Sequence, residues 1–115
     1  GYCLRSLNVT NVPLQLIALK KPHWNQVNYP TIQREFPFTS IQWQKLIGLL
    51  DAEKFQMLDD RIGCPDCADG GAEWIQVNWS KKSKRVIFEY GALVNSIEEF
   101  SKNLRVLREQ YLKNL

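Results

Sequence analysis

Two cysteines separated by two residues are the most chemically specific feature of this 115-residue sequence. Cys64 and Cys67 stand in the segment GCPDCADGGAEW, which also carries acids and a tryptophan, namely Asp66, Asp69, Glu73 and Trp74. A cysteine pair at this spacing performs thiol–disulfide exchange, supplies half of a metal site, or closes a local bridge. The neighbouring residues must decide between these three kinds of chemistry.

Redox chemistry needs a thiolate that a helix N-terminus or nearby cations stabilise. This pair instead follows a predicted helix and precedes a predicted strand, and the acids Asp60, Asp66 and Asp69 oppose thiolate formation. We therefore favour a disulfide between Cys64 and Cys67, or two thiols in a tight turn, as a structural element of the loop. A thiol–disulfide role centred on the pair remains the alternative function.

Metal binding is the other part of that alternative. A structural zinc site needs about four ligands, and beyond the pair the chain offers only the distant Cys3 and His23. For calcium, the loop supplies Asp66, Asp69 and Glu73, but their spacing does not match a known calcium loop. We predict no metal and no cofactor.

Catalytic motifs are missing from the sequence. It contains no G-x-S-x-G, no phosphate-binding glycine loop and no H-E-x-x-H. The adjacent acids Asp59 and Asp60 fall at a predicted helix end, where solvated carboxylates are common. We predict a non-enzymatic protein.

The run KKSKR at residues 81–85 is the strongest local cluster of positive charge. With Trp79 beside it, this cluster has the composition of a nucleic-acid or anionic-membrane patch. The net charge of the chain is only +3, and charged hairpin tips commonly keep a sheet edge soluble. We therefore predict no nucleic-acid partner.

The elements that must position these residues alternate between strands and helices. Residues 14–19 and 24–29 have strand composition around a turn. Thr39 and Gln42 form a capping-box pattern before an apolar helical face, and Asp51 can cap a short helix after it. Residues 73–79 and 85–90 alternate like the strands of a hairpin. A second capping-box pattern, Ser96 with Glu99, precedes an apolar stripe that runs to residue 111.

This order predicts an α+β fold of the form ββαββα, with one four-stranded antiparallel sheet and helices packed on one of its faces. We predict that residues 1–13 are an N-terminal lead-in or linker and that residues 14–115 form a single domain. Hydrophobic residues make up 44% of the chain, as in ordinary globular domains. No apolar run reaches the roughly 18 residues of a transmembrane segment.

The segment GCPDCADGGAEW, with the hairpin and helix after it, resembles a group of uncharacterised exported proteins of Bacteroidetes-type bacteria, which are often predicted lipoproteins. The resemblance covers roughly residues 38–112 and implies a periplasmic or outer-membrane-anchored location in the cell envelope, with any signal segment outside this sequence. In that compartment Cys64 and Cys67 would be oxidised. In element order alone, the chain is similar to emfourin-type protease inhibitors.

Together these observations predict a non-enzymatic cell-envelope domain that binds a protein or other ligand, with an inhibitor-like role as one form of that binding. We expect the binding residues to be those of the loop, Cys64, Asp66, Cys67, Asp69 and Glu73, with Trp74 as an aromatic anchor.

Overall fold

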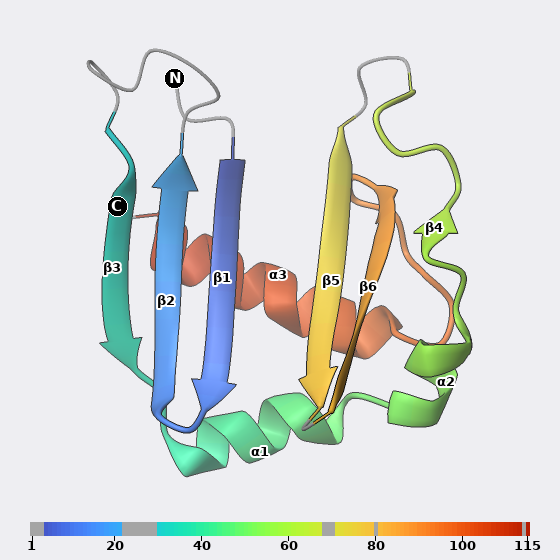
Figure 1. Ribbon diagram of the computed structural model, residues 1–115. Coiled ribbons are helices and arrows are strands. Elements are labelled where there is room, and N and C mark those ends of the chain that lie inside the picture. Colours follow the sequence, from blue (N-terminus) through green and yellow to red (C-terminus); the bar gives the residue numbers. More distant parts are fainter. Residues whose placement is uncertain (1–3, 22–29, 68–70, 80, 114) are drawn as a thin grey trace. The chain divides into compact units, whose positions relative to one another are not determined.

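A computed structural model describes residues 4–21, 30–67, 71–79, 81–113 and 115. The protein has an α+β fold, as predicted, and its elements are shown in Figure 1. The chain divides into two units. The first contains Gly1–Gly48 and Lys102–Leu115, and the second contains Leu49–Ser101.

The first unit contains an antiparallel sheet of three strands in the order β1-β2-β3. These strands are β1 (Leu4–Asn11), β2 (Leu14–Lys21) and β3 (Ile32–Pro37). Strands β1 and β2 are joined by a tight turn at Val12 and Pro13, whose peptide bond is cis. Leu16 and Ala18 of the central strand are completely buried, so the face to which both belong lies in the core.

Two predictions for this part of the chain are corrected. Residues 4–11 do not form a lead-in, because they pair with β2 along its whole length. The predicted four-stranded antiparallel sheet is also wrong, since the described residues form two three-stranded sheets. Pro13 suggested the end of a linker, but it lies in a hairpin turn instead. The strand predicted at residues 24–29 lies outside the described residues, and β3 occupies the place beside β2.

Helix α1 (Ser40–Gly48) begins as its sequence predicts. The Thr39 N–H donates to Gln42 Oε1 at 2.9 Å, and the Gln42 N–H donates to Thr39 Oγ1 at 3.1 Å, which confirms the capping box. Phe38 and Leu46 are buried. Capping therefore fixes the start of the helix, and apolar side chains hold it.

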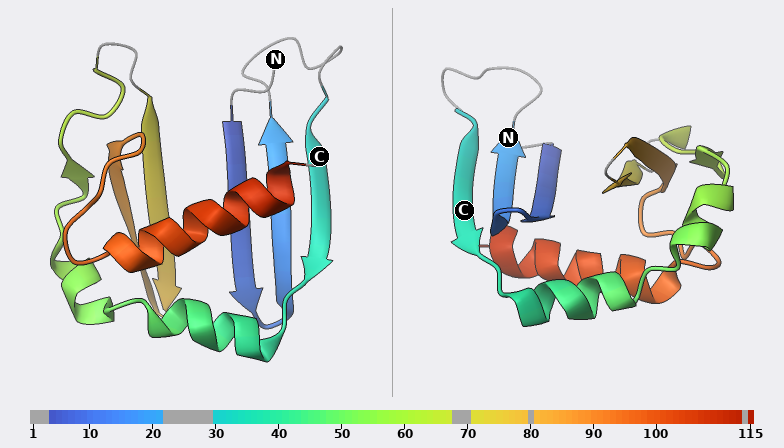
Figure 2. Two further views of the ribbon diagram at one scale, coloured as in Figure 1. Left: turned by 180° about the vertical axis from the view of Figure 1, so that it is seen from behind. Right: turned by 60° about the horizontal axis from the view of Figure 1, so that its bottom comes forward.

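Helix α3 (Glu98–Leu112) contributes its later turns to the first unit. Figure 2 shows this part of the helix against the β1-β2-β3 sheet. The ring centroids of Phe36 and Tyr111 are 4.9 Å apart, and Lys20 Nζ donates to the carbonyl of Leu115 at 3.0 Å. An aromatic contact and a hydrogen bond from a lysine therefore hold the C-terminal end of the chain to this sheet.

The second unit contains helix α2 (Ala52–Met57) and a sheet in the order β4-β6-β5. Strands β5 (Ala72–Trp79) and β6 (Lys82–Glu89) form the predicted hairpin, paired antiparallel throughout. The short β4 (Arg61–Ile62) was not predicted and pairs parallel with residues 87–88. The predicted helix after Asp51 is confirmed, since Asp51 Oδ1 accepts the Lys54 N–H at 3.1 Å.

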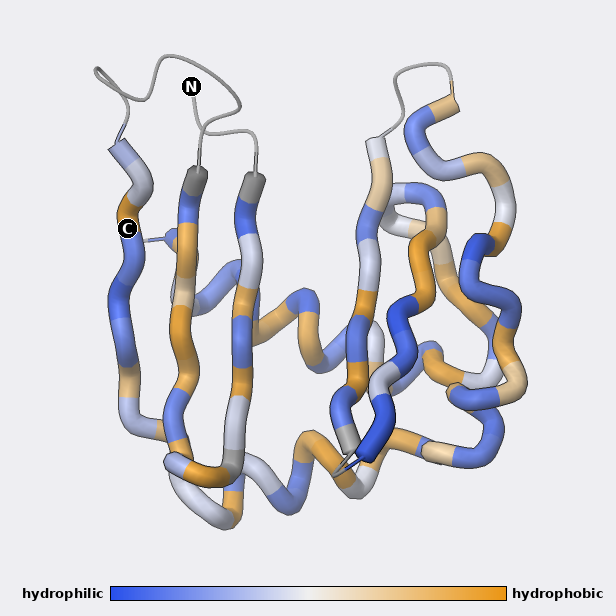
Figure 3. The backbone as a smooth tube through the Cα atoms, viewed as in Figure 1, coloured by the Kyte–Doolittle hydropathy of each residue, from blue (hydrophilic) through white to orange (hydrophobic). Residues whose placement is uncertain are grey.

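The two faces of the β5–β6 hairpin differ in burial. Ile75, Val86 and Phe88 are buried on the inner face, and Phe55 of α2 is also buried. Figure 3 shows hydrophilic residues over the start of β6 and hydrophobic ones towards its end. Along each strand, the alternation that predicted the hairpin places every second residue on the buried inner face and the residues between them on the outer face.

The start of α3 differs from the prediction. The helix begins at Glu98, and Ser96 has a φ of 81°, which is not the extended conformation of an N-cap residue. The Ser96 N–H donates to Asn95 Oδ1 at 3.1 Å. Ile97 and Phe100 are buried, so the apolar stripe at this end of the helix is confirmed.

Candidate functional site

The loop that contains the cysteine pair is a closed turn. The sulfur atoms of Cys64 and Cys67 lie within bonding distance, and their Cα atoms are 5.5 Å apart, within the usual range for a disulfide. The Cys67 N–H also donates to the Cys64 carbonyl at 3.1 Å. The bridge predicted from the spacing is thus found, and both cysteines are exposed.

The ends of this turn are fastened to the neighbouring sheet. The Cys64 N–H donates to Glu89 Oε1 at 2.8 Å, which ties the turn to the end of β6. The carbonyl of Gly71 accepts the N–H groups of Asp66 and Tyr90, at 3.1 and 3.3 Å. These bonds make the loop a joint between β4 and the β5–β6 hairpin.

The acids predicted to bind a partner occupy different environments. Glu73 is only 7% exposed, and its Oε1 accepts the Gly91 N–H at 2.6 Å, so this carboxylate joins the start of β5 to the residues after β6. Asp66 is exposed, with a φ of 61°. Asp69 lies outside the described residues. Of the two acids that can be placed, only Asp66 has its side chain on the surface.

Trp74 lies on the outer face of β5, as its place in the alternation predicts, and is 44% exposed. The guanidinium carbon of Arg85 lies 4.0 Å from a ring centroid of Trp74, in the geometry of a cation–π contact. Arg85 Nε donates to Gln76 Oε1 at 2.9 Å, and Gln76 Nε2 donates to Asn78 Oδ1 at 2.9 Å. We call these four residues, Trp74, Gln76, Asn78 and Arg85, the Trp74 surface.

The Trp74 surface is ordered before any partner arrives. Gln76 and Arg85 are direct cross-strand neighbours, so the sheet itself places the amide beside the guanidinium. Of these four residues, only Trp74 was predicted from the sequence to bind a partner, and Gln76, Asn78 and Arg85 were not. The signal was available, because alternation puts all four on one face of the predicted hairpin.

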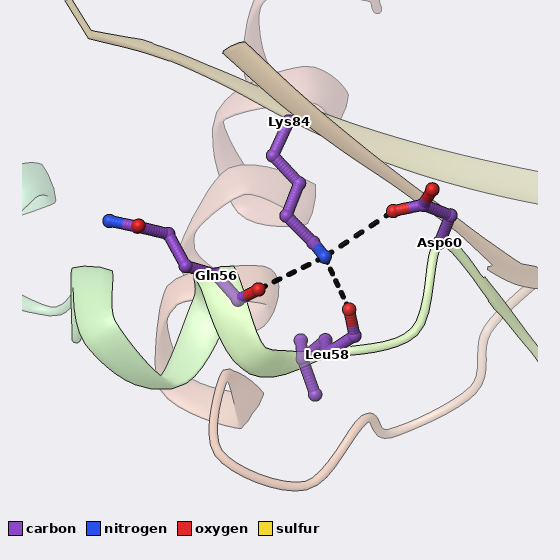
Figure 4. Close-up of polar contacts among 4 residues, drawn as sticks. All are labelled: Gln56, Leu58, Asp60 and Lys84. Atoms are coloured by element: carbon purple, nitrogen blue, oxygen red, sulfur yellow. Dashed lines mark hydrogen bonds and ion pairs between the residues drawn. The ribbon is translucent and has the colours of Figure 1, made fainter. Parts of the chain in front are cut away.

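Two lysines of the basic run are engaged with helix α2. Lys84 Nζ donates to the Gln56 carbonyl at 3.1 Å and to the Leu58 carbonyl, and lies 3.3 Å from Asp60 Oδ1, as Figure 4 shows. Lys82 Nζ donates to Gln56 Oε1 at 2.7 Å. The side chain of Lys84 is only 18% exposed. This part of the basic run therefore stabilises the carboxyl end of α2, where cations interact favourably with the helix dipole.

The alternative metal-binding role has no assembled ligand set in the described part of the chain. Among those residues, no group of three or more His, Cys, Asp or Glu side chains is placed to hold a metal ion. Cys3 and His23, which were weighed as zinc ligands, lie outside the described residues. No helix within the described ranges is long and apolar enough to cross a membrane.

Comparisons of the chain with protein-family models, curated proteins and solved structures found no match.

Proposed function

We propose that this protein is a non-enzymatic domain of the cell envelope that binds another protein through the Trp74 surface. The observation that carries the proposal is the 44% exposure of Trp74 on the outer sheet face, with Arg85 stacked on its ring. Tryptophan and arginine are the residue types that most often dominate the binding energy of protein interfaces.

The order of the surface favours binding. Arg85 is held by Gln76 and by the Trp74 ring, so these side chains lose little conformational freedom when a partner arrives. The Trp74 ring supplies apolar area, while Gln76 and Asn78 supply amide groups around it. This combination of an aromatic centre and polar neighbours is typical of a protein-binding surface.

The cysteine loop supports this surface from the adjoining part of the unit. We propose that the Cys64–Cys67 bridge acts as a structural turn before β5. The resemblance of residues 38–112 to exported, lipoprotein-like bacterial proteins supports a cell-envelope location, since disulfides persist in oxidising compartments. An inhibitor-like role is one form that such binding takes.

Photo-crosslinking tests the proposal. A photoreactive aromatic amino acid, which keeps an aromatic ring at this position, replaces Trp74 in one variant and Val106, an exposed apolar residue of α3, in a control variant. Incubated with a bacterial envelope extract, the first variant should give one dominant crosslinked protein that unlabelled wild-type protein competes away. Unlabelled Trp74→Ala should compete poorly. The proposal fails if position 74 gives no crosslink, or if both positions give the same products.

A thiol–disulfide role is the second candidate, favoured by the exposure of both Cys64 and Cys67. The Glu89 carboxylate bound to the Cys64 N–H opposes it, because a nearby negative charge disfavours a thiolate. Catalysed reduction of insulin at a rate above that of free dithiol, lost in Cys64→Ser, would favour this second candidate over the first.

A further inference from the structure

Strand β6 has one side that is only partly paired. It pairs with β5 over residues 82–89, but with β4 only at Ile87 and Phe88. The Ile87 N–H donates to the Asp60 carbonyl at 2.9 Å, so the backbone groups of Ile87 point towards β4. The earlier part of β6 therefore extends beyond its β4 neighbour.

The alternation of backbone groups along a strand identifies which N–H and C=O groups of β6 point to this side. Residues two apart point their N–H and C=O groups in the same direction, so those of Ser83 and Arg85 face the same side as those of Ile87. In the described part of the chain, no strand pairs with residues 82–85 on that side. Two residues thus present donors and acceptors in the spacing of a sheet ladder.

The side of β6 on which Ser83 and Arg85 have no strand neighbour is called the free edge. It opens onto a groove with a volume of about 620 Å³. Charged residues of both signs line the groove, and the cations outnumber the carboxylates. The complete lining is Gln56, Asp60, Lys82, Ser83, Lys84, Arg85 and Ile87. Three cations and one carboxylate give it a formal charge of +2 (3 − 1). The excess of cations favours an acidic occupant.

Lysines often protect a free edge by extending across it. In this unit, Lys82 and Lys84 belong to the inner face and donate to groups of Gln56, at 2.7 and 3.1 Å. Arg85 belongs to the outer face and donates to Gln76. None of these bonds engages the backbone of Ser83 or Arg85, and both residues are exposed.

We propose that an extended, acidic peptide segment of the partner protein adds as a strand to the free edge of β6, with main-chain bonds to Ser83 and Arg85. This is β-strand addition, in which the backbone gives affinity and the side chains give specificity. The inference rests on the proposed function and names the chemistry of its partner. Arg85 connects the two proposed binding sites, since it lines the groove and also belongs to the Trp74 surface.

Amide hydrogen exchange with a defined probe tests the inference. The probe is a peptide of alternating valine and glutamate with blocked ends, and the control replaces glutamate by lysine. We expect the acidic peptide to slow exchange at the Ser83 and Arg85 amides by at least about tenfold, since each gains a hydrogen-bond partner. The Lys84 amide, which faces β5, should change little. Unchanged exchange at Ser83 and Arg85, or equal protection by the lysine peptide, would overturn the inference.

A matched pair of variants tests the main-chain contact. Ser83→Pro removes the N–H that faces the groove without removing a bond to β5, whereas Ser83→Ala keeps it. We expect Ser83→Pro to weaken binding of the acidic peptide by about tenfold and Ser83→Ala to bind like the wild type. Equal binding by both variants contradicts the inference. If Ser83→Pro does not fold, the exchange result on the wild type decides.

The two proposals fail separately. Loss of crosslinking at position 74, with peptide protection at Ser83 and Arg85 intact, would remove the Trp74 surface and leave the strand-addition site. Crosslinking at position 74 without peptide protection would leave the proposed function and remove only the acidic strand.

Discussion

Lys84 Nζ lies 3.1 Å from the carbonyl oxygen of Gln56, and this bond connects strand β6 to the carboxyl end of helix α2. Asp51 caps the other end of the same helix through the Lys54 N–H. A helix of six residues is too short to be stable alone, because nucleation costs more than its few internal bonds return. Helix α2 therefore depends on contacts at both ends and on burial of Phe55.

Replacing Lys84 by methionine should lower the free energy of unfolding. The change keeps most of the apolar stem but removes the ammonium that binds the carbonyls of Gln56 and Leu58. We expect a loss of about 1–3 kcal/mol, the usual cost for hydrogen bonds that involve a charged group. Urea unfolding measures it. Lys81→Met, at an exposed position of the same run, should stay within about 0.5 kcal/mol of the wild type, and equal losses in both variants would contradict the capping role.

Two glycine-to-alanine changes should have opposite effects. Gly63 has a φ of 70°, and a Cβ there would lie 2.7 Å from Glu89 Oε1, the atom that accepts the Cys64 N–H. We expect Gly63→Ala to destabilise the protein by about 1–2 kcal/mol or more. Gly48, in helix α1, has nothing within 4 Å of such a Cβ, so Gly48→Ala should stabilise by up to about 1 kcal/mol. Thermal melting of both variants checks the signs, and a shift in the same direction for both would be inconsistent with this geometry.

Glu73 should matter for stability more than for binding. Glu73→Ala removes the buried carboxylate that accepts the Gly91 N–H at 2.6 Å and should cost about 1–3 kcal/mol. Glu73→Gln keeps an acceptor and should cost about 1 kcal/mol, because a charge-assisted bond becomes a neutral one. Asp66→Asn is the control, since Asp66 is exposed and asparagine tolerates its φ of 61°. Chemical unfolding that ranks Asp66→Asn as the most damaging variant would refute the assignment.

The bridge between Cys64 and Cys67 should contribute modestly to stability. Loop-closure entropy for a bridge with a sequence separation of three predicts about 2 kcal/mol. Intact mass before and after a reductant should show the gain of two hydrogens, and the reduced protein should melt at a lower temperature but stay folded, because the hydrogen bonds of the loop remain. Complete unfolding on reduction would show that the bridge, and not the hydrogen bonds, holds the joint.

Local signals in the sequence predicted the local features of the fold. The capping box of Thr39 with Gln42 and the cap at Asp51 involve residues only three apart, so their side chains meet as soon as the helix forms. The β5–β6 hairpin follows from alternation in both strands and a short connection. The exposed position of Trp74 follows from the same alternation.

Features that depend on distant partners were not predicted. Strand β1 has weak alternation of its own and exists because β2 pairs with it. The two residues of β4 form a strand only because β6 lies beside them. The split into two sheets depends in the same way on which edges meet, and no pattern within one strand encodes that choice.

Lys81 and Lys84 differ in exposure, and this difference makes it possible to detect separation of α2 from β6 by chemical labelling. Lys81 is exposed, while three residues away the Lys84 side chain is only 18% exposed and bound to two carbonyls. An amine-reactive reagent should therefore modify Lys81 at once and Lys84 only when α2 and β6 separate. The ratio of the two labels would record how often this unit opens under native conditions, without any mutation.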